Sequence, residues 1–308
     1  MKPAKNRALI GDLLLLVTAV VWGSSFVAQE SGMEVIGPFT FQAIRSLIGS
    51  LVLLPVIFLT DLRERKSPDY RQPTPEQKKT FLRGSIACGI ILFVAANLQQ
   101  IGMANGTASG KAGFITAFYM LLVPIFGLIL GRKESPVVFP CALVALGGLY
   151  LLCLKDSSAF GKGDLYCLGC AVVFAVHIMT VSHFAPLVNG LKLSCAQFFI
   201  CGILSSVCMV VFETPKMPEI LAVWFPIFYS GAFSCGIAYT LQIIGQKYTA
   251  PTVASMIMSL ESVFATLSGL VILHTVPSGA EWIGMALMFI AIIAVQLLPE
   301  WIGKRKKA

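Results

Sequence analysis

Two ionisable residues stand inside long apolar segments of this 308-residue chain, where a charge is costly and usually serves a function. Arg45 lies in the segment 36–59, and Glu261 lies in the segment 252–273. If each segment is a membrane helix with a rise of about 1.5 Å per residue, the two residues lie about 12 Å and about 14 Å deep, from opposite faces. The pair is compatible with a structural ion pair between two helices. It is also compatible with a functional pair, in which Arg45 binds an anionic substrate group and Glu261 carries a proton.

A stripe of polar and aromatic residues follows the first apolar segment at helical spacing. Its members are four, three and four residues apart and therefore share one face of a helix: Thr18, Trp22, Ser25 and Gln29. Such a stripe favours the wall of a central polar cavity, with Trp22 and Ser25 as candidate substrate-binding residues. The alternative is that Ser and Gln side chains form hydrogen bonds between helices while Trp22 contributes packing. Gln42 lies one helical turn before Arg45 and should flank it in the same site.

Further polar residues in apolar segments are candidate substrate-binding residues: Asn97, Tyr119, His177 and Tyr239. His177 would suit proton coupling, because an unperturbed imidazole titrates near neutral pH, but a neutral, hydrogen-bonded His177 is the alternative. Asn97 and Tyr239 lie near the predicted ends of their helices, beside Gln99 and Gln242. These two glutamines are candidates for gates near opposite membrane faces, or for side chains that reach the polar interface.

The composition is that of a helical membrane protein. Hydrophobic residues make up 56% of the chain and charged residues 12%, whereas soluble domains carry about 25% charged residues. A membrane β-barrel would need alternating apolar and polar residues instead of continuous apolar runs. The polar stretch 60–82 contains several prolines and predicts a surface loop that carries, if anything, a short interfacial helix. Ten apolar segments are long enough to cross a bilayer as helices: 9–28, 36–59, 83–103, 112–131, 136–154, 164–184, 194–212, 222–243, 252–273 and 280–298.

Positive charge predicts the orientation. With the N-terminus inside, most of the 23 Lys and Arg residues fall on the cytoplasmic side. Both termini, residues 1–8 and the basic tail 299–308, are therefore expected in the cytoplasm of a plasma-membrane protein. The net charge of +8 indicates contact with anionic lipid headgroups rather than nucleic-acid binding. The nine cysteines lie in or beside apolar segments as small hydrophobic side chains, and Cys167, Cys170 and His177 supply too few ligands for a metal site.

Short internal matches indicate two repeats. Gly11-Asp12-Leu13 recurs 152 residues later as Gly163-Asp164-Leu165, and Ile101-Gly102 recurs 143 residues later as Ile244-Gly245. Five helices per repeat is an odd number, so the second repeat must be inverted in the membrane. Transporters commonly place their substrate site at the interface of such repeats, near mid-membrane. The predicted domains are a first repeat, a linker and a second repeat at 9–154, 155–163 and 164–298.

Longer motifs occur in both halves of the chain. They are Trp22-Gly23-Ser24-Ser25-Phe26, Ala43-Ile44-Arg45, Ala112-Gly113-Phe114-Ile115-Thr116, Val123-Pro124, Gly131-Arg132, Gly147-Gly148-Leu149-Tyr150-Leu151-Leu152 and Ser259-Leu260-Glu261-Ser262-Val263-Phe264-Ala265. Together they resemble the EamA-type members of the drug/metabolite transporter superfamily. The chain departs from the family pattern where Ser262 replaces a proline and where His274-Thr275 stands in place of a common Gly-Glu. The resemblance implies ten helices in two five-helix repeats and transport, in preference export, of a small metabolite such as an amino acid.

The expected function is secondary active or gradient-driven transport by alternating access, with no cofactor and no metal. A membrane scaffold or sensor without transport activity is the alternative. An enzyme is not expected, because the chain lacks His-Glu-x-x-His, Gly-x-Ser-x-Gly and Walker motifs. The expected partners are a small-molecule substrate and the lipid bilayer. Gly127-x-x-x-Gly131 could pack helices within one chain or between the subunits of a homodimer.

Overall fold

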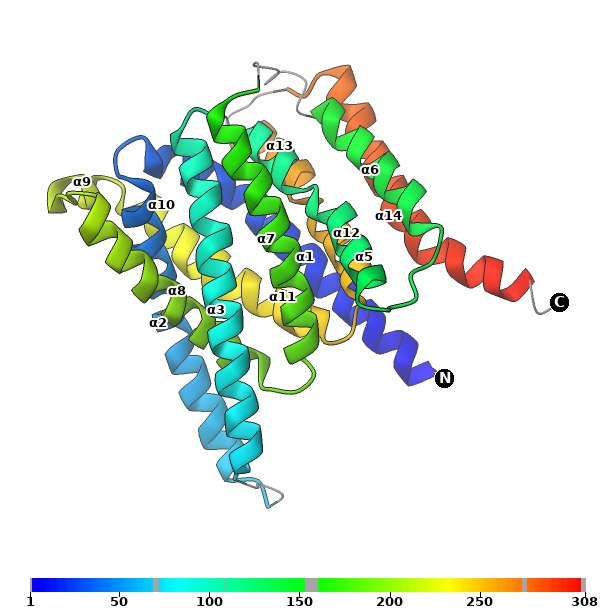
Figure 1. Cartoon of the computed structure of the whole chain (residues 1–308), viewed down its shortest axis with the longest axis horizontal. Helices are drawn as coiled ribbons and strands as arrows, with labels where there is room; N and C mark the ends of the chain where they lie inside the picture. Colours follow the sequence, from blue (N-terminus) through cyan, green and yellow to red (C-terminus); the bar gives the residue numbers. More distant parts are fainter. Residues whose placement is uncertain (1, 69–71, 108, 153–159, 273–275, 306–308) are drawn as a thin grey trace.

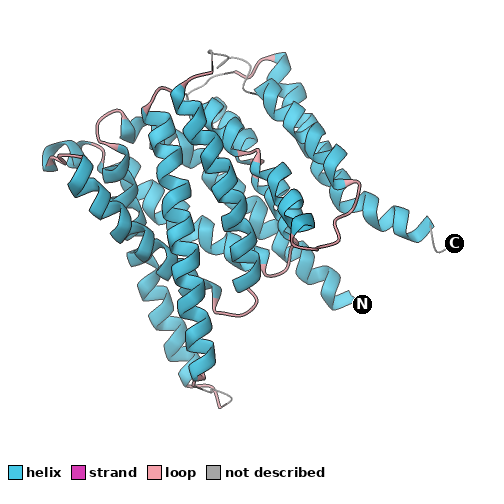
Figure 2. Ribbon diagram, viewed as in Figure 1, coloured by secondary structure: helices cyan, strands magenta, loops and turns pink. Residues whose placement is uncertain are grey.

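The protein is a bundle of helices (Figures 1 and 2). In this computed structural model, all residues are described except 1, 69–71, 108, 153–159, 273–275 and 306–308. The described part contains no strand, in agreement with the predicted all-helical class. Predictions for Cys153, for linker residues 155–159 and for His274-Thr275 fall outside the described residues.

The first half of the chain forms helices α1 to α6. Their bounds are α1 (Lys2–Met33), α2 (Pro38–Arg65), α3 (Pro75–Ala104), α4 (Ser109–Thr116), α5 (Tyr119–Ile129) and α6 (Val138–Leu152). The apolar segment 112–131 was predicted as one helix. It is interrupted instead, because α4 ends at Thr116 and α5 begins at Tyr119.

The second half forms helices α7 to α14 and the π-helical segment η2. Their bounds are α7 (Lys162–Phe184), α8 (Gly190–Phe212), α9 (Met217–Ala222), α10 (Trp224–Tyr229), η2 (Ser230–Ala238), α11 (Tyr239–Gln246), α12 (Pro251–Met258), α13 (Glu261–Ile272) and α14 (Gly279–Arg305). The predicted helix 222–243 therefore comprises α10, η2 and the start of α11. The predicted helix 252–273 is interrupted between α12 and α13.

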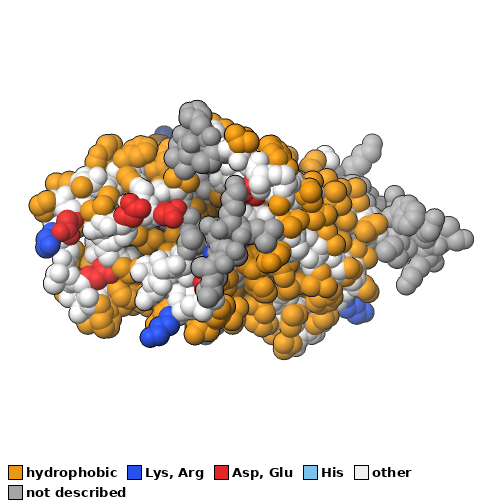
Figure 3. Space-filling model, turned by 90° about the horizontal axis from the view of Figure 1, so that it is seen from above, with side chains coloured by type: hydrophobic (Ala, Val, Ile, Leu, Met, Phe, Trp, Pro, Cys, Tyr) orange, Lys and Arg blue, Asp and Glu red, His pale blue; other side chains and the backbone are white. Residues whose placement is uncertain are grey.

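Much of the bundle is suited to a lipid surrounding. Large hydrophobic side chains are exposed around it, and Figure 3 shows them over much of the described surface. Such a surface is favourable against lipid and unfavourable in water. The shorter apolar helix α6 and the interrupted pair α12–α13 occupy two of the predicted segments. Among the described residues, eight helical stretches are long and apolar enough to cross a membrane: 6–33, 38–65, 75–104, 111–129, 162–184, 190–212, 224–246 and 279–298.

The polar stretch 60–82 is mostly helical, so the predicted loop is wrong in extent. α2 continues to Arg65 and α3 begins at Pro75, and only residues 66–74 connect them. A capping box explains the early start of α3. The Gln77 N–H donates to Thr74 Oγ1 at 3.2 Å, and the Thr74 N–H donates to Gln77 Oε1 at 2.9 Å. Pro75 occupies a first-turn position that needs no N–H, and the two helix ends project beyond the rest of the bundle in Figure 1.

One of the two interruptions, between α12 and α13, has a local cause for bending. In α12 the Ser255 hydroxyl and the following Ser259 hydroxyl donate to backbone carbonyls three residues earlier, at 2.8 Å and 2.7 Å. Such bonds compete with the helical ladder and bend helices. Pro124, which lacks a backbone N–H, lies inside α5 and beyond the interruption at residues 117–118, so it does not cause that interruption. New half-helices begin at Tyr119 and at Glu261, so both side chains project from interruptions in apolar helices.

The start of α1 is held against α11 by a contact that we call clamp 1, formed by Gly11, Asp12, Gly245 and Thr249. Gly11 packs so closely that an added Cβ would lie 2.9 Å from the Gly245 carbonyl oxygen and 2.5 Å from Thr249 Oγ1. Asp12 Oδ1 accepts a hydrogen bond from Thr249 Oγ1 at 2.8 Å. Only glycine allows this approach, because any side chain at position 11 would collide with α11 or with Thr249.

The start of α7 makes the corresponding contact with α3, which we call clamp 2, formed by Gly163, Asp164, Gly102 and Thr107. An added Cβ on Gly163 would lie 2.5 Å from the Gly102 carbonyl oxygen. Asp164 Oδ1 accepts from Thr107 Oγ1 at 2.9 Å, and its other oxygen lies 2.7 Å from Lys111 Nζ and accepts from a backbone N–H at 2.8 Å. The starts of α1 and α7 lie at opposite ends of the bundle in Figure 1, so one clamp lies at each end.

Candidate functional site

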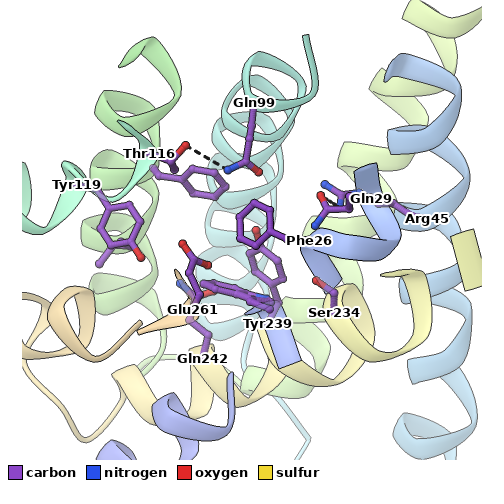
Figure 4. Close-up of a pocket in the computed structure, with 13 residues that line it drawn as sticks. Phe26, Gln29, Arg45, Gln99, Thr116, Tyr119, Ser234, Tyr239, Gln242 and Glu261 are labelled. Atoms are coloured by element: carbon purple, nitrogen blue, oxygen red, sulfur yellow. Dashed lines mark hydrogen bonds between the residues drawn. The ribbon is translucent and has the colours of Figure 1, made fainter. Parts of the chain in front are cut away.

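A small chamber lies at the centre of the bundle, and residues from both halves of the chain line it (Figure 4). Its volume is about 40 Å³. One enclosed water needs about 10–15 Å³ on the same measure, so the chamber has room for a few waters and not for a metabolite. The centre of the bundle is therefore packed too tightly in this structure to hold a metabolite. The lining residues are Trp22, Phe26, Gln29, Arg45, Gln99, Thr116, Tyr119, Phe174, Ile178, Ser234, Tyr239, Gln242 and Glu261.

Five of the predicted site residues line this chamber, namely Trp22, Arg45, Tyr119, Tyr239 and Glu261. They come from α1, α2, α5, α11 and α13, which lie far apart in the sequence. Gln99 and Gln242, which were predicted near opposite membrane faces, both line this same chamber. Sequence reasoning did not select the apolar lining residues Phe26, Phe174 and Ile178, because an apolar residue in an apolar helix gives no signal of its own.

The other predicted site residues lie outside the chamber wall. Gln42 is behind Arg45 and accepts a hydrogen bond from it. The amide of Asn97 points toward α8 and donates to Ser205 Oγ at 3.0 Å. His177 is fully buried and shares a hydrogen bond of 3.1 Å with Gln197, which fits the alternative of a hydrogen-bonded histidine. Ser25 donates to Ser230 Oγ at 3.4 Å.

The polar stripe on α1 serves both of the roles considered for it. Trp22 and Gln29 line the chamber. Thr18 and Ser25 instead bond to the neighbouring η2 segment, Thr18 Oγ1 donating to the Ala238 carbonyl oxygen at 3.0 Å. Consecutive members of the stripe therefore alternate between the chamber and a helix interface.

Arg45 is a buried cation held by amide groups. Its side chain is 6% exposed; Nε donates to Gln42 Oε1 at 2.7 Å, and Nη1 donates to Gln29 Oε1 at 2.5 Å. Gln29 Oε1 also accepts from Gln100 Nε2 at 2.8 Å, and the guanidinium carbon lies 5.5 Å from the centre of the Phe41 ring. Among the described residues, no carboxylate lies within ion-pair distance of Arg45. Amide oxygens satisfy donors without cancelling the charge, so the positive charge remains available to the chamber.

Glu261 is a buried carboxylate on another side of the chamber. It is 5% exposed and is the first residue of α13. The Tyr119 hydroxyl lies within electrostatic reach of Glu261 but makes no hydrogen bond of standard length and angle. Glu261 and Arg45 do not form the ion pair that the sequence allowed, and Phe26 lies between them in Figure 4.

Aromatic rings and unpaired polar atoms complete the wall. The Trp22 and Tyr239 rings are 4.6 Å apart between centres. Among the described residues, Trp22 Nε1, the Tyr119 hydroxyl and Gln242 Oε1 are buried without a hydrogen-bond partner of standard length and angle. Buried polar atoms are normally paired, so these three are suited to contact a polar ligand.

An all-helical, multi-pass membrane protein with a buried, charged central chamber has the architecture of a solute transporter. Comparison with known proteins gives the family. Residues 9–154 and again 161–297 match the EamA-like transporter family, and the chain belongs to that family.

Relatives support the same class. A protein of Archaeoglobus fulgidus described as an uncharacterized transporter is 30% identical over 297 residues, covering 94% of this chain and 87% of the relative. The uncharacterized transporter YwfM of Bacillus subtilis is 25% identical over 304 residues, covering 94% and 95%. A protein crystal structure superposes with a TM-score of 0.75 over 99% of both chains at 23% identity, which establishes the fold alone.

Proposed function

We propose that this transporter binds a small zwitterionic metabolite of the amino acid class in the central chamber and exports it across the cell membrane by alternating access. The observation that carries the proposal is that two buried ionisable groups, Arg45 and Glu261, border the chamber and form no ion pair with each other. A buried charge is stable only when it is compensated. A substrate with one carboxylate and one ammonium group would compensate Arg45 and Glu261 at the same time.

The wall suits such a substrate group by group. Arg45 has five N–H donors, of which two have the amide partners described above, so donors remain for a carboxylate. The Trp22, Phe26 and Tyr239 rings would contact the apolar part of the substrate. When no ammonium group is present, Glu261 would take up a proton, and movement of that proton with the closing and opening of the chamber would couple transport to a proton gradient.

We further propose ten spans in two inverted repeats, with both termini in the cytoplasm. The family matches the chain twice, over ranges close to the predicted repeats. The clamps add independent support, because each joins a Gly-Asp pair of one half to a Gly and a Thr of the other half. Thr249 follows Thr107 by 142 residues, close to the spacing of the sequence matches. The possible homodimer remains a prediction, although Gly127 is covered by Glu134 of its own chain.

Alternating access would use the two clamps in turn. The chamber is too small for a metabolite, so one end of the bundle would have to separate before a substrate could enter. In the proposed orientation, opening clamp 1 connects the chamber to the cytoplasm and opening clamp 2 connects it to the outside. Clamp 2 carries an additional ion pair, so clamp 1 is expected to open more readily.

Binding and flux measurements test this function. Purified protein is screened by thermal shift with amino acids and with analogues that lack either the carboxylate or the ammonium group, and ligands that bind are assayed for flux in proteoliposomes. Arg45→Lys keeps the charge but loses the planar fork, and it is expected to weaken binding about tenfold. Arg83→Lys, at an exposed position, is the matched control.

The outcomes separate the alternatives. Equal stabilisation by the amine-only analogues would exclude Arg45 as the carboxylate site. A folded protein that moves no member of the panel would favour the scaffold or sensor function instead.

A further inference from the structure

A second cavity lies on the flank of the bundle, between α5 and α7, and shares no residue with the central chamber. Its volume is about 490 Å³, within the range of about 300–1,000 Å³ that small-molecule sites occupy. Its α7 wall follows one helix face at spacings of three, one, three and one residues: Val176, Met179, Thr180, His183 and Phe184. The α5 side supplies Phe126, Ile129, Leu130 and Arg132. We call this cavity the α5–α7 groove.

One end of the groove carries two basic residues, Arg132 and His183. His183 lies in the last turn of α7, and Arg132 follows the end of α5. The chain turns at Gly131, which has a φ of 75°, and the Arg132 N–H donates to the Gly127 carbonyl oxygen at 2.9 Å. This helix-ending turn fixes the position of Arg132 relative to the groove.

Within the described part of the chain, Arg132 and His183 have no acidic partner within ion-pair distance. The acidic residue of this connection, Glu134, accepts a hydrogen bond from Thr252 Oγ1 at 2.9 Å and does not line the groove. The basic end is therefore complementary to an anion.

The rest of the groove is complementary to a hydrocarbon chain. Val176 to His183 spans about 10 Å along α7 at 1.5 Å per residue, all of it beside apolar side chains except Thr180. The Thr180 hydroxyl is already bonded to the Val176 carbonyl oxygen at 2.7 Å. Ile129 and Leu130 are 75% and 67% exposed, so the groove opens sideways toward the region where acyl chains lie.

We propose that the α5–α7 groove binds one anionic phospholipid, with its phosphate at Arg132 and His183 and an acyl chain along the apolar walls. Basic groups between membrane helices at the cytoplasmic side are suited to acidic lipid headgroups, and the proposed orientation places the ends of α5 and α7 on that side. The site is separate from the chamber, so it does not depend on the identity of the transported substrate.

The test uses the full-length protein in a non-ionic detergent, titrated with phosphatidylglycerol and, separately, with phosphatidylcholine of the same acyl chains. Binding is measured by native mass spectrometry and thermal shift. Tighter binding of phosphatidylglycerol is expected, and Arg132→Gln should weaken it about fivefold, the effect of about one surface cation on an acidic lipid. Lys133→Gln is the matched control, because it removes the same charge from the next residue, which does not line the groove.

A second variant tests the apolar wall without a change of charge. Val176→Trp fills the groove and should reduce phosphatidylglycerol binding while the response to substrate in the chamber stays unchanged. This variant also keeps the test decisive if Arg132→Gln fails to fold.

Several results would overturn the proposal. Equal binding of the two lipids, or an equal effect of Lys133→Gln and Arg132→Gln, would show diffuse attraction rather than a site. Full competition by inorganic phosphate at millimolar concentration would show an anion site without a role for the acyl chain. Unchanged binding in Val176→Trp would place the lipid elsewhere.

Discussion

Replacing Thr249 with valine should open one end of the bundle selectively. The valine side chain has a similar shape but lacks the hydroxyl that donates to Asp12 in clamp 1 at 2.8 Å. Among the described contacts, Asp12 accepts no hydrogen bond from any other side chain. The corresponding replacement in clamp 2, Thr107→Val, leaves Asp164 with Lys111 at 2.7 Å and a backbone N–H at 2.8 Å. The same chemical change therefore has different consequences at the two ends.

The size of the effect follows from the number of partners that remain. A hydrogen bond to a charged group contributes about 1.5–3 kcal/mol, and the lower end applies to Asp12 because the side chain is only partly buried. A loss of about 1.4 kcal/mol changes an equilibrium tenfold. Thr249→Val should therefore raise the open population at clamp 1 about tenfold. Thr107→Val should cost about 0.6 kcal/mol, near the low end for a single bond, and change the population about threefold.

Hydrogen exchange read by mass spectrometry measures both ends in one experiment. Peptides covering 8–15 and 243–250 report on clamp 1, and peptides covering 100–106 and 162–168 report on clamp 2. In Thr249→Val, exchange should be about tenfold faster in the first pair of peptides and unchanged in the second. Thr266→Val is the control, because among the described contacts the Thr266 hydroxyl bonds within its own helix, to the Ser262 carbonyl oxygen at 3.0 Å.

Two results would refute this reasoning. Equal acceleration at both ends would mean that the variant loosens the whole bundle and that the clamps do not act separately. No acceleration in Thr249→Val would mean that clamp 1 is held by helix packing at Gly11 and that the Asp12 hydrogen bond contributes little.

Two further substitutions test the packing and the charge of the chamber. Gly23→Ala should lower the free energy of unfolding by about 1–3 kcal/mol, because the added Cβ would lie 2.5 Å from the Glu261 carbonyl oxygen and 2.6 Å from the Ala265 backbone nitrogen. Gly147→Ala is the control, because an added Cβ there has no atom within 4 Å and should not lower the stability. Equal melting temperatures for the two variants would contradict the close contact of α1 with α13. Glu261→Gln should abolish the pH dependence of flux while substrate exchange at equal pH persists; a folded variant with unchanged pH dependence would eliminate Glu261 as the proton carrier.

Hydropathy alone predicted which segments are helical but not where two of them are interrupted. The interruptions fall at Ala117-Phe118 and Ser259-Leu260, which contain neither glycine nor proline. The family proline after Glu261 is absent here, since Ser262 occupies its place, and the interruption persists. The capping sequence at Thr74 was a readable signal, by contrast, and should have shortened the predicted loop. Signals in the local sequence can thus be recovered, while bends that depend on hydroxyl bonding and neighbouring helices cannot.

The candidate site was predictable to the extent that charge inside an apolar helix is rare. That argument selected Arg45 and Glu261, and both border the chamber. The same argument applied to neutral polar residues was ambiguous, because Asn97 bonds to Ser205 and His177 bonds to Gln197 at helix interfaces. Neutral polar residues pair readily between helices, whereas a lone charge rarely finds a partner there. One sequence cannot distinguish the two uses of a neutral polar side chain.

The two proposed repeats differ in the side chains of their clamps and of their half-helices, the parts to which we assign roles in transport. Clamps 1 and 2 share their glycine, aspartate and threonine, but the chain adds Lys111 only at clamp 2. Likewise, the two half-helices begin with different side chains, Tyr119 in one and Glu261 in the other. If the halves were chemically identical, the states open to either side would have equal energy in the absence of a gradient. Under the proposed mechanism, unequal clamps would give those states unequal energies, and an acid on only one half-helix would let a proton gradient act on one of them.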